Sequence, residues 1–147
     1  MKVTIISVGK SHDKDLKESI FSYTKRTFTN FSTEWSLIPT STIDMEAKAI
    51  LSSIKKEDYV VLLDEEGTDM SSISLSSLLT DKMNDATRRM VFIIGGAYGV
   101  NNEVKKRSNY IWKLSKLTLP HMLVRLVLIE QIYRALSILQ GGKYHHE

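Results

Sequence analysis

The chain has 147 residues, of which 42% are hydrophobic and 25% charged, and its formal net charge is +3 at pH 7. One domain of this length can bury a core without disulfides, and because the chain contains no cysteine, a disulfide framework and a thiolate metal site are both excluded. The modest positive charge fits a nucleic-acid partner, but it equally fits many cytosolic enzymes and does not choose between them.

The first part of the sequence alternates between strand and helix patterns. "MKVTIISVGK" predicts a strand over residues 2–8 and has too few apolar residues for a signal peptide, so we expect a cytoplasmic protein. Apolar residues at three- and four-residue spacing predict a helix over 13–28, and a short strand over 34–38 ends at Pro39. Serine and threonine of the capping type open the next helix, over 41–54.

Continuous apolar runs mark two further strands. "DYVVLLD" and "RMVFIIGG" are typical of strands that are covered on both faces of a sheet. A serine-rich helix over 72–83 separates them, and a short helix from 101 and a last strand over 109–115 follow. This order predicts an α/β fold in one domain, residues 1–147, with a parallel-type sheet flanked by helices.

The last helix, residues 120–141, is too apolar for a single core-facing stripe. Polar side chains interrupt it too often for a membrane span. We therefore expect one face on the sheet and a second face, which includes Ile132, against another copy of the chain in a homodimer. Arg134 follows Glu130 by four residues, which is the spacing of a salt bridge on a helix. For Arg125 the sequence allows two roles, an ion pair with Glu130 or a contact with an RNA phosphate.

Three connections at the ends of predicted strands indicate a ligand site. "VFIIGGAYGV" ends a buried strand on glycines, but its glycine spacing matches neither a Rossmann fingerprint nor a P-loop. By itself this turn is either a tight connection or a ligand-binding loop. Residues 62–72 and 113–125 also follow predicted strands with polar or small side chains. Because ligands bind at the carboxyl ends of parallel strands, the three loops predict a pocket of backbone donors and acceptors that suits a ring such as adenine.

Four stretches together resemble a known family. "LDEEGTDMSS", "IGGAYGV", "LSKLTLPHMLVRLVLIEQIYRA" and the terminal "YHHE" stand in the order and spacing of the bacterial enzymes that methylate N3 of a pseudouridine in large-subunit (23S) ribosomal RNA. The resemblance covers essentially the whole chain. It implies a SPOUT-superfamily fold with a carboxyl-terminal trefoil knot, S-adenosylmethionine as the methyl donor, no metal, and the RNA of an assembled ribosome as partner.

The resemblance also implies which residues bind the donor: Leu63, Gly95, Leu114, Ser115, Lys116, Leu117, Thr118 and Leu119. Backbone groups of these loops can pair with the adenine edge while leucines pack on its faces. Glycine at position 95 lets the main chain approach the donor closely. The chain departs from the family pattern at Met122 and at Gly142 and Lys143, which precede the tail.

The tail holds the candidate catalytic residues. The proton on N3 must be removed, and histidine is the side chain suited to that task near neutral pH. His145 is expected to take or relay this proton, and Tyr144 to stack on the base and offer its hydroxyl to a carbonyl. His121, in the first turn of the last helix, is either another base or a structural group. Because a helix of about 20 residues is about 30 Å long, we expect the tail to complete the site of a neighbouring subunit.

Two functions of different classes fit these features. The first is the RNA methyltransferase. The alternative is a non-catalytic ribosome-binding protein with the same fold, which would use the basic clusters at 88–89 and 105–107. Taken alone, each cluster also fits a solvated helix face. Calorimetry with S-adenosylmethionine separates the two functions. A third function, that of a nucleotide-dependent oxidoreductase, is disfavoured because the chain lacks the glycine fingerprint and the acidic residue that such enzymes require.

Overall fold

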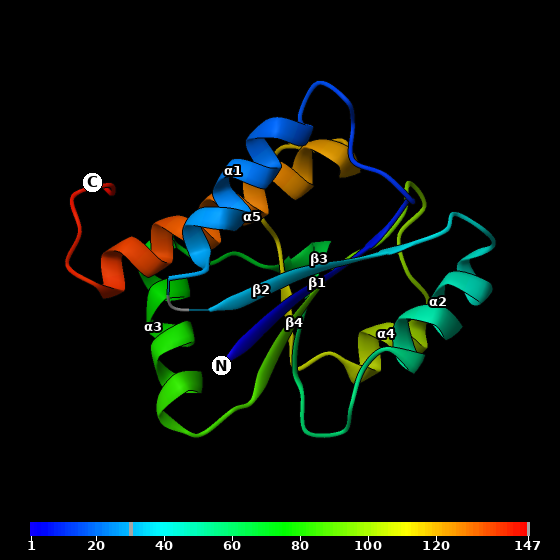
Figure 1. Cartoon of the computed structure of the whole chain (residues 1–147). Coiled ribbons are helices and arrows are strands. Elements are labelled where there is room, and N and C mark those ends of the chain that lie inside the picture. Colours follow the sequence, from blue (N-terminus) through cyan, green and yellow to red (C-terminus); the bar gives the residue numbers. More distant parts are fainter. Residues whose placement is uncertain (30, 147) are drawn as a thin grey trace.

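Five parallel strands form one sheet in the order β2-β1-β4-β3-β5 (Figure 1). The computed structural model describes residues 1–29 and 31–146, so Glu147, the last residue of "YHHE", lies outside the described residues. The strands are β1 (Lys2–Val8), β2 (Ser32–Ile38), β3 (Tyr59–Thr68), β4 (Arg89–Ile94) and β5 (Tyr110–Trp112).

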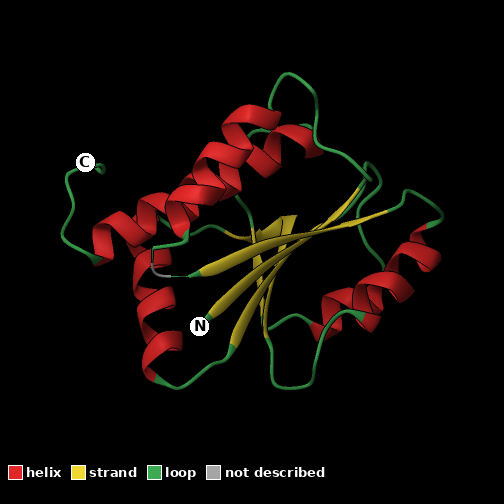
Figure 2. Ribbon diagram, in the orientation of Figure 1, coloured by secondary structure: helices red, strands yellow, loops and turns green. Residues whose placement is uncertain are grey.

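Helices cover both faces of this sheet. They are α1 (Lys17–Thr27), α2 (Ile43–Ser52), α3 (Ser72–Asn84), α4 (Asn102–Arg107) and α5 (His121–Leu139). Figure 2 shows α1, α3 and α5 on one face and α2 and α4 on the other. The predicted α/β fold class, with a parallel sheet flanked by helices, is confirmed.

Side chains of alternate residues in the central strands pack into two hydrophobic cores, one on each face of the sheet. Ile5 and Phe92 point into the core beneath α1, α3 and α5, whereas Ile6 and Ile93 point into the core beneath α2 and α4. All four side chains are fully buried. The continuous apolar runs follow from this arrangement, because a strand between two helical layers has no solvent face.

The first helix begins later than its apolar spacing predicts, at Lys17 rather than residue 13. The Asp13 carboxylate accepts the N–H of Asp15 (2.8 Å), and the Asp13 carbonyl accepts the N–H of Leu16 (3.0 Å). An aspartate that bonds its own backbone two residues on makes a turn in competition with a helix. The turn at 13–16 therefore takes the place of the first helical turn.

The wide apolar surface of α5 is covered largely within the chain, by the sheet, α1 and α3. Ile132 is fully buried in this core, so its predicted place on a free second face is wrong. Met122, Leu123 and Val127, near the start of α5, remain half-buried. No helix in the described part of the chain is long and apolar enough to cross a membrane.

Candidate functional site

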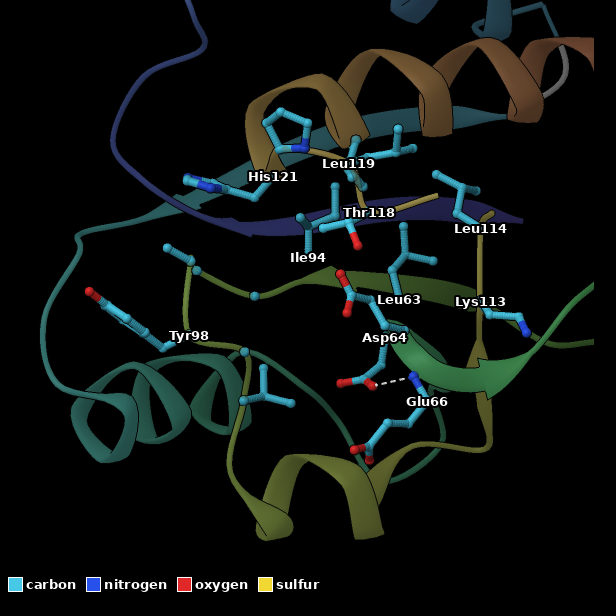
Figure 3. Close-up of a pocket in the computed structure, with 18 of the residues that line it drawn as sticks. Leu63, Asp64, Glu66, Ile94, Tyr98, Lys113, Leu114, Thr118, Leu119 and His121 are labelled. Carbon is cyan, nitrogen blue, oxygen red and sulfur yellow. Dashed lines mark hydrogen bonds between the residues drawn. The ribbon is translucent and has the colours of Figure 1, made fainter. Parts of the chain in front are cut away.

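The carboxyl ends of β3, β4 and β5 lie side by side, because these strands are neighbours in the sheet. The connection after β3 leads to α3 on one face and the connection after β4 leads to α4 on the other, so the two diverge and leave a crevice. The crevice is a cavity of about 740 Å³ (Figure 3), a size typical of small-molecule sites. The predicted convergence of three strand-end loops is confirmed.

Seven of the eight predicted donor-binding residues line this cavity: Leu63, Gly95, Leu114, Ser115, Leu117, Thr118 and Leu119. The eighth, Lys116, does not line it and is exposed. Figure 3 shows leucines around the space at the ends of β3 and β5 and before α5. The loops therefore supply apolar walls and main-chain polar groups, while the contact of these residues with a donor stays a prediction.

The glycine turn after β4 folds tightly on itself. The Gly99 N–H donates to the Gly96 carbonyl (3.0 Å), and Gly99 has a φ of 81°, which favours glycine. A Cβ atom on Gly95 would lie 2.9 Å from Val100 Cγ1 and 3.2 Å from the Gly99 carbonyl carbon. The space that a side chain at Gly95 would need is thus occupied by the loop itself. The tight turn is therefore the first reason for glycine at position 95, and the same turn shapes the cavity wall.

Charged side chains of both signs border the cavity: Asp64, Glu65, Glu66, Lys105 and Lys113. Lys105 Nζ lies 3.6 Å from a Glu66 oxygen in a largely solvated pair, which contributes little to stability. The sequence placed the acidic residues in a strand-end stretch that predicted a loop and Lys105 in a basic cluster, but it did not bring them together at one site. Among the described residues, no three His, Asp or Glu side chains come together as a metal site.

The tail lies away from the cavity of its own chain, at the other end of α5. The Tyr144 hydroxyl donates to Glu130 Oε1 (3.0 Å) and lies 3.1 Å from the Tyr23 hydroxyl of α1. The Arg134 guanidinium lies 4.7 Å from the Tyr144 ring centroid and 2.6 Å from Glu130, which confirms the predicted salt bridge. Neither Tyr144 nor His145 lines the cavity.

These contacts limit what the tail can do where it lies. Burial, together with hydrogen bonds to Tyr23 and Glu130, raises the pKa of Tyr144, so its hydroxyl stays protonated. His145 Nδ1 lies 3.2 Å from Arg134 Nη1 and accepts a hydrogen bond from it, which leaves the ring hydrogen on Nε2. That Nε2 is buried with no partner among the described residues. His145 must therefore leave Arg134 before it can accept a proton.

Arg125 of α5 holds the end of β1 behind the cavity and is fully buried. Its five N–H groups meet Ser7 Oγ (2.7 Å), the carbonyl oxygens of Val8 (2.9 Å), Gly9 (3.0 Å) and Ser11 (2.9 Å), and His12 Nδ1 (3.1 Å). None of these acceptors is a carboxylate, and burial lowers the pKa of Arg125. Both roles left open for Arg125, an ion pair with Glu130 and an RNA phosphate contact, are excluded by this position.

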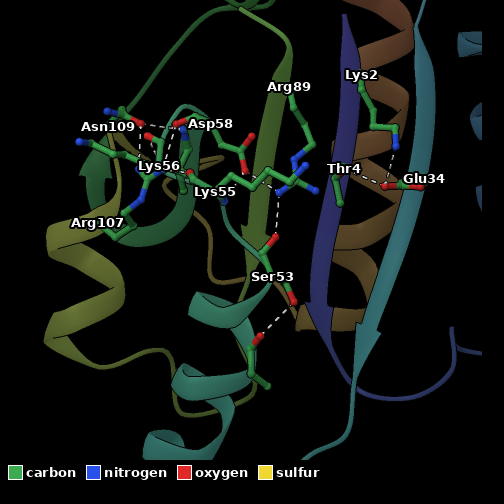
Figure 4. A network of polar contacts seen from close by, with 12 residues as sticks. Lys2, Thr4, Glu34, Ser53, Lys55, Lys56, Asp58, Arg89, Arg107 and Asn109 are labelled. Carbon is green, nitrogen blue, oxygen red and sulfur yellow. Dashed lines mark hydrogen bonds and ion pairs between the residues drawn. The ribbon is translucent and has the colours of Figure 1, made fainter.

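Two arginines of the basic clusters are bound to the body of the protein near the amino ends of β3, β4 and β5, the opposite end from the cavity (Figure 4). Arg89 donates to Asp58 (2.5 Å) and to the Ser53 carbonyl (2.7 Å), and Arg107 donates to the carbonyls of Lys55 (2.7 Å) and Asp58 (3.1 Å). Burial alone would raise the pKa of Asp58, but hydrogen bonds from Arg89 and the Lys55 N–H, with the charges of Arg89 and Arg107, lower it. These arginines fasten the α2–β3 connection.

Comparison with known sequences relates the whole chain to one group of enzymes. The family described as "Predicted SPOUT methyltransferase" matches residues 1–145. The chain is 37% identical to "Ribosomal RNA large subunit methyltransferase H" of Bacteroides thetaiotaomicron over all of both chains. It is 42% identical to the protein of the same name from Streptococcus agalactiae, over 99% of each.

Solved structures show the same fold at low sequence identity. The tRNA (m1G37) methyltransferase of Aquifex aeolicus matches with a TM-score of 0.57 and 16% identity, over all of this chain and 76% of that one. The SpoU methyltransferase AviRb of Streptomyces viridochromogenes, solved in complex with AdoMet, matches with a TM-score of 0.51 and 13% identity. That match covers 97% of this chain and 59% of the AviRb chain.

Proposed function

Because the chain belongs to the SPOUT methyltransferase family, we propose that it transfers the methyl group of S-adenosylmethionine to N3 of a pseudouridine in large-subunit (23S) ribosomal RNA. The observation that carries this proposal is the cavity at the ends of β3, β4 and β5, lined by seven of the residues predicted for the donor. We also propose that the substrate is the RNA of an assembled ribosome and that the protein acts in the cytoplasm. The proposal further includes a single domain whose carboxyl-terminal part forms a trefoil knot.

The cavity suits an adenosyl group in size and chemistry. Leu63, Leu114 and Leu119 offer apolar contacts to the faces of an adenine ring, and the β5–α5 connection, which contributes most of its residues to the same lining, can offer main-chain polar groups to the ring edge. S-adenosylmethionine supplies a methyl group that is already activated for displacement. The protein is left chiefly with orientation, which can supply a large part of the rate acceleration of a two-substrate reaction.

The acceptor nitrogen must also lose its proton, and we assign this step to the tail of a second subunit. His121 lines the cavity at the start of α5, whereas His145 lies beside Arg134, 13 positions and about 20 Å further along the helix. A tail docked there does not serve its own cavity. In an antiparallel homodimer it can reach the neighbouring one, where His145 takes or relays the N3 proton and the Tyr144 ring stacks on the base.

Half-buried apolar side chains near the start of α5 support the homodimer. Met122, Leu123 and Val127 lie in the turns next to the cavity, outside the part of α5 that α1 and α3 bury most completely. Positions 123 and 127 are four apart and share one side of the helix. Pairing of this surface between two chains would bring each tail toward the other chain's cavity.

Methyl transfer to ribosomes tests the proposal. Ribosomes from a strain that lacks the enzyme are incubated with the protein and S-adenosylmethionine, and the RNA is examined by mass spectrometry for a methylated pseudouridine. Removal of residues 144–147 should preserve donor binding but lower the rate by roughly 10²-fold if a base is lost. A wild-type protein that binds ribosomes but gives no calorimetric signal with S-adenosylmethionine would instead be the non-catalytic ribosome-binding protein.

Gly95→Val tests the place of the donor site. The branched side chain would collide with Val100 and Gly99 and so reshape the cavity wall. We expect donor affinity to be lost while a folded dimer remains, as judged by circular dichroism and light scattering. Unchanged affinity in the folded variant would place the donor elsewhere.

A further inference from the structure

The two most exposed of the large hydrophobic side chains in the described chain stand on the rim of one cavity. Tyr98 has 90% of its surface exposed and Leu117 has 72%, and both line the cavity at the ends of β3, β4 and β5. They come from different connections, one after β4 and one after β5. Exposed apolar side chains gathered around a cavity mark a place where another molecule binds.

Tyr98 is held in place by the turn that carries it. It lies between Gly96 and Gly99, whose backbone groups are joined by a hydrogen bond of 3.0 Å. The Asn101 side chain then caps α4 through the N–H of Val104 (3.2 Å) and reaches Asp44 at the start of α2 (3.3 Å). The ring is therefore presented by a short turn fastened at its base.

The neighbouring groups suit a nucleotide. Figure 3 shows Tyr98 and His121 at one edge of the cavity, with Lys113 at the opposite edge. Lys116, which does not line the cavity, is exposed on the connection that follows β5. Single-stranded nucleic acid binds where aromatic rings take bases and lysines pair with phosphates. The mouth of this cavity carries an aromatic ring at one edge and a lysine at the other, together with the acidic Asp64, Glu65 and Glu66.

We propose that Tyr98 is a stacking platform for an unpaired base of the RNA substrate at the mouth of the cavity. This inference rests on the RNA methyl transfer proposed above, and it adds a substrate-binding residue outside the predicted donor site. Any base can stack, so Tyr98 adds affinity for an unpaired strand without selecting a sequence.

Four substitutions at one position separate stacking from other roles. Tyr98→Ala should lower kcat/KM for ribosomes by roughly 5- to 150-fold, the range for loss of one base–aromatic stack. Tyr98→Leu keeps apolar bulk without a ring face and should be impaired like Tyr98→Ala. Tyr98→Phe and Tyr98→Trp should stay near the wild type. Phe28→Ala, which truncates another exposed aromatic ring away from the cavity, is the matched control and should have no effect.

Two further measurements identify the occupant of the rim. Affinity for S-adenosylmethionine, from calorimetry, and mass, from light scattering, should be unchanged in Tyr98→Ala. A shift in mass would show that a second copy of the chain covers Tyr98, and a kcat/KM equal to that of the wild type would show that no base stacks there. Either result overturns the inference, while an inactive wild type would overturn the proposed function itself.

Discussion

Arg125 shows how a single residue can tie distant parts of the chain together. Its guanidinium is fully buried and bonds five acceptors over residues 7–12, none of them charged. A buried cation without a carboxylate is tolerated only when its hydrogen bonds are satisfied. The β1–α1 connection supplies those bonds through its carbonyl oxygens, so the two partners stabilise one another.

Arg125→Met tests this role. Methionine has a similar reach but no N–H groups, so Ser7 and several carbonyl oxygens would be left buried without partners. We expect the free energy of unfolding, measured with urea, to fall by about 3 kcal/mol or more. Arg88→Met removes an exposed arginine and, as the control, should change stability by no more than about 0.5 kcal/mol. Equal effects of the two substitutions would contradict the assignment.

His12 makes part of the same cluster sensitive to pH. It packs edge-on against Phe21 and Trp35, and burial, with the charges of Arg125 and Lys17, lowers its pKa from 6.5. The unfolded chain therefore binds this proton more readily than the folded one. The contribution to stability is complete above the unfolded pKa and is lost as pH falls through the folded pKa.

His12→Asn removes the titration and keeps an acceptor for Arg125. Between pH 7.5 and 5, the wild type should lose more unfolding free energy than this variant, as followed by urea denaturation at each pH. Parallel pH profiles of the two proteins would show that His12 titrates alike in both states.

Local patterns identified some of these residues and missed others. Strand-end patterns predicted the three loops, and the family resemblance pointed to Leu63 and Gly95 within them, which line the cavity. Lys116 came from the same resemblance but does not line the cavity. His12 and Ser7 lie 113 and 118 positions from Arg125. No periodicity links residues so far apart, so the role of Arg125 could emerge only from the folded chain.

At the scale of elements, the strand and helix order was predictable and the coverage of α5 was not. Apolar periodicity indicates how much of a helix surface is buried, and α5 does have buried residues along most of its length. It does not report what covers the helix, and here α1 and α3 cover much of what the sequence assigned to a second subunit. The start of α1 also differs from its apolar spacing, because the Asp13 side chain bonds the N–H of Asp15 and so makes a turn in place of the first helical turn.

Asp58→Asn tests the fastening of the α2–β3 connection. Only 2% of the Asp58 side chain is exposed, and the substitution leaves Arg89 without its counter-charge. We expect a loss of about 2–4 kcal/mol in unfolding free energy at pH 7. Because the pKa of Asp58 is lowered in the folded state, the difference from the wild type should be constant above pH 5 and shrink below about pH 4. A difference that persists unchanged at low pH would exclude the carboxylate charge as its cause.

For the whole molecule, the surface at the start of α5 replaces Ile132 as the place to test the homodimer. Light scattering of the wild type should give about twice the chain mass. Leu123→Glu puts a charge on a half-buried side chain and should give folded monomers, whereas Ile132→Glu would unfold the core. A monomeric wild type would remove the composite site as well.

Complementation tests whether each site uses two chains. Gly95→Val lacks a donor cavity and the chain without residues 144–147 lacks a tail, so each homodimer should be inactive. After subunit exchange, half of the dimers are mixed, and each has one complete site, so about one quarter of wild-type activity should return. No recovery in confirmed mixed dimers would mean that each chain supplies its own tail.

The place of β1 in the sheet has a consequence for the chain as it is being synthesised. β1 is made first, yet one of its two neighbours, β4, begins more than 80 residues after β1 ends. At roughly 5–20 residues per second, the emerging strand waits about 4–16 s with an open edge, and bare strand edges invite pairing with other chains. Arg125 arrives later still. The sheet can thus be completed only after β5 is made, at residue 112 of 147. A nascent chain stalled before β4 carries the aggregation-prone edge that the finished protein has closed.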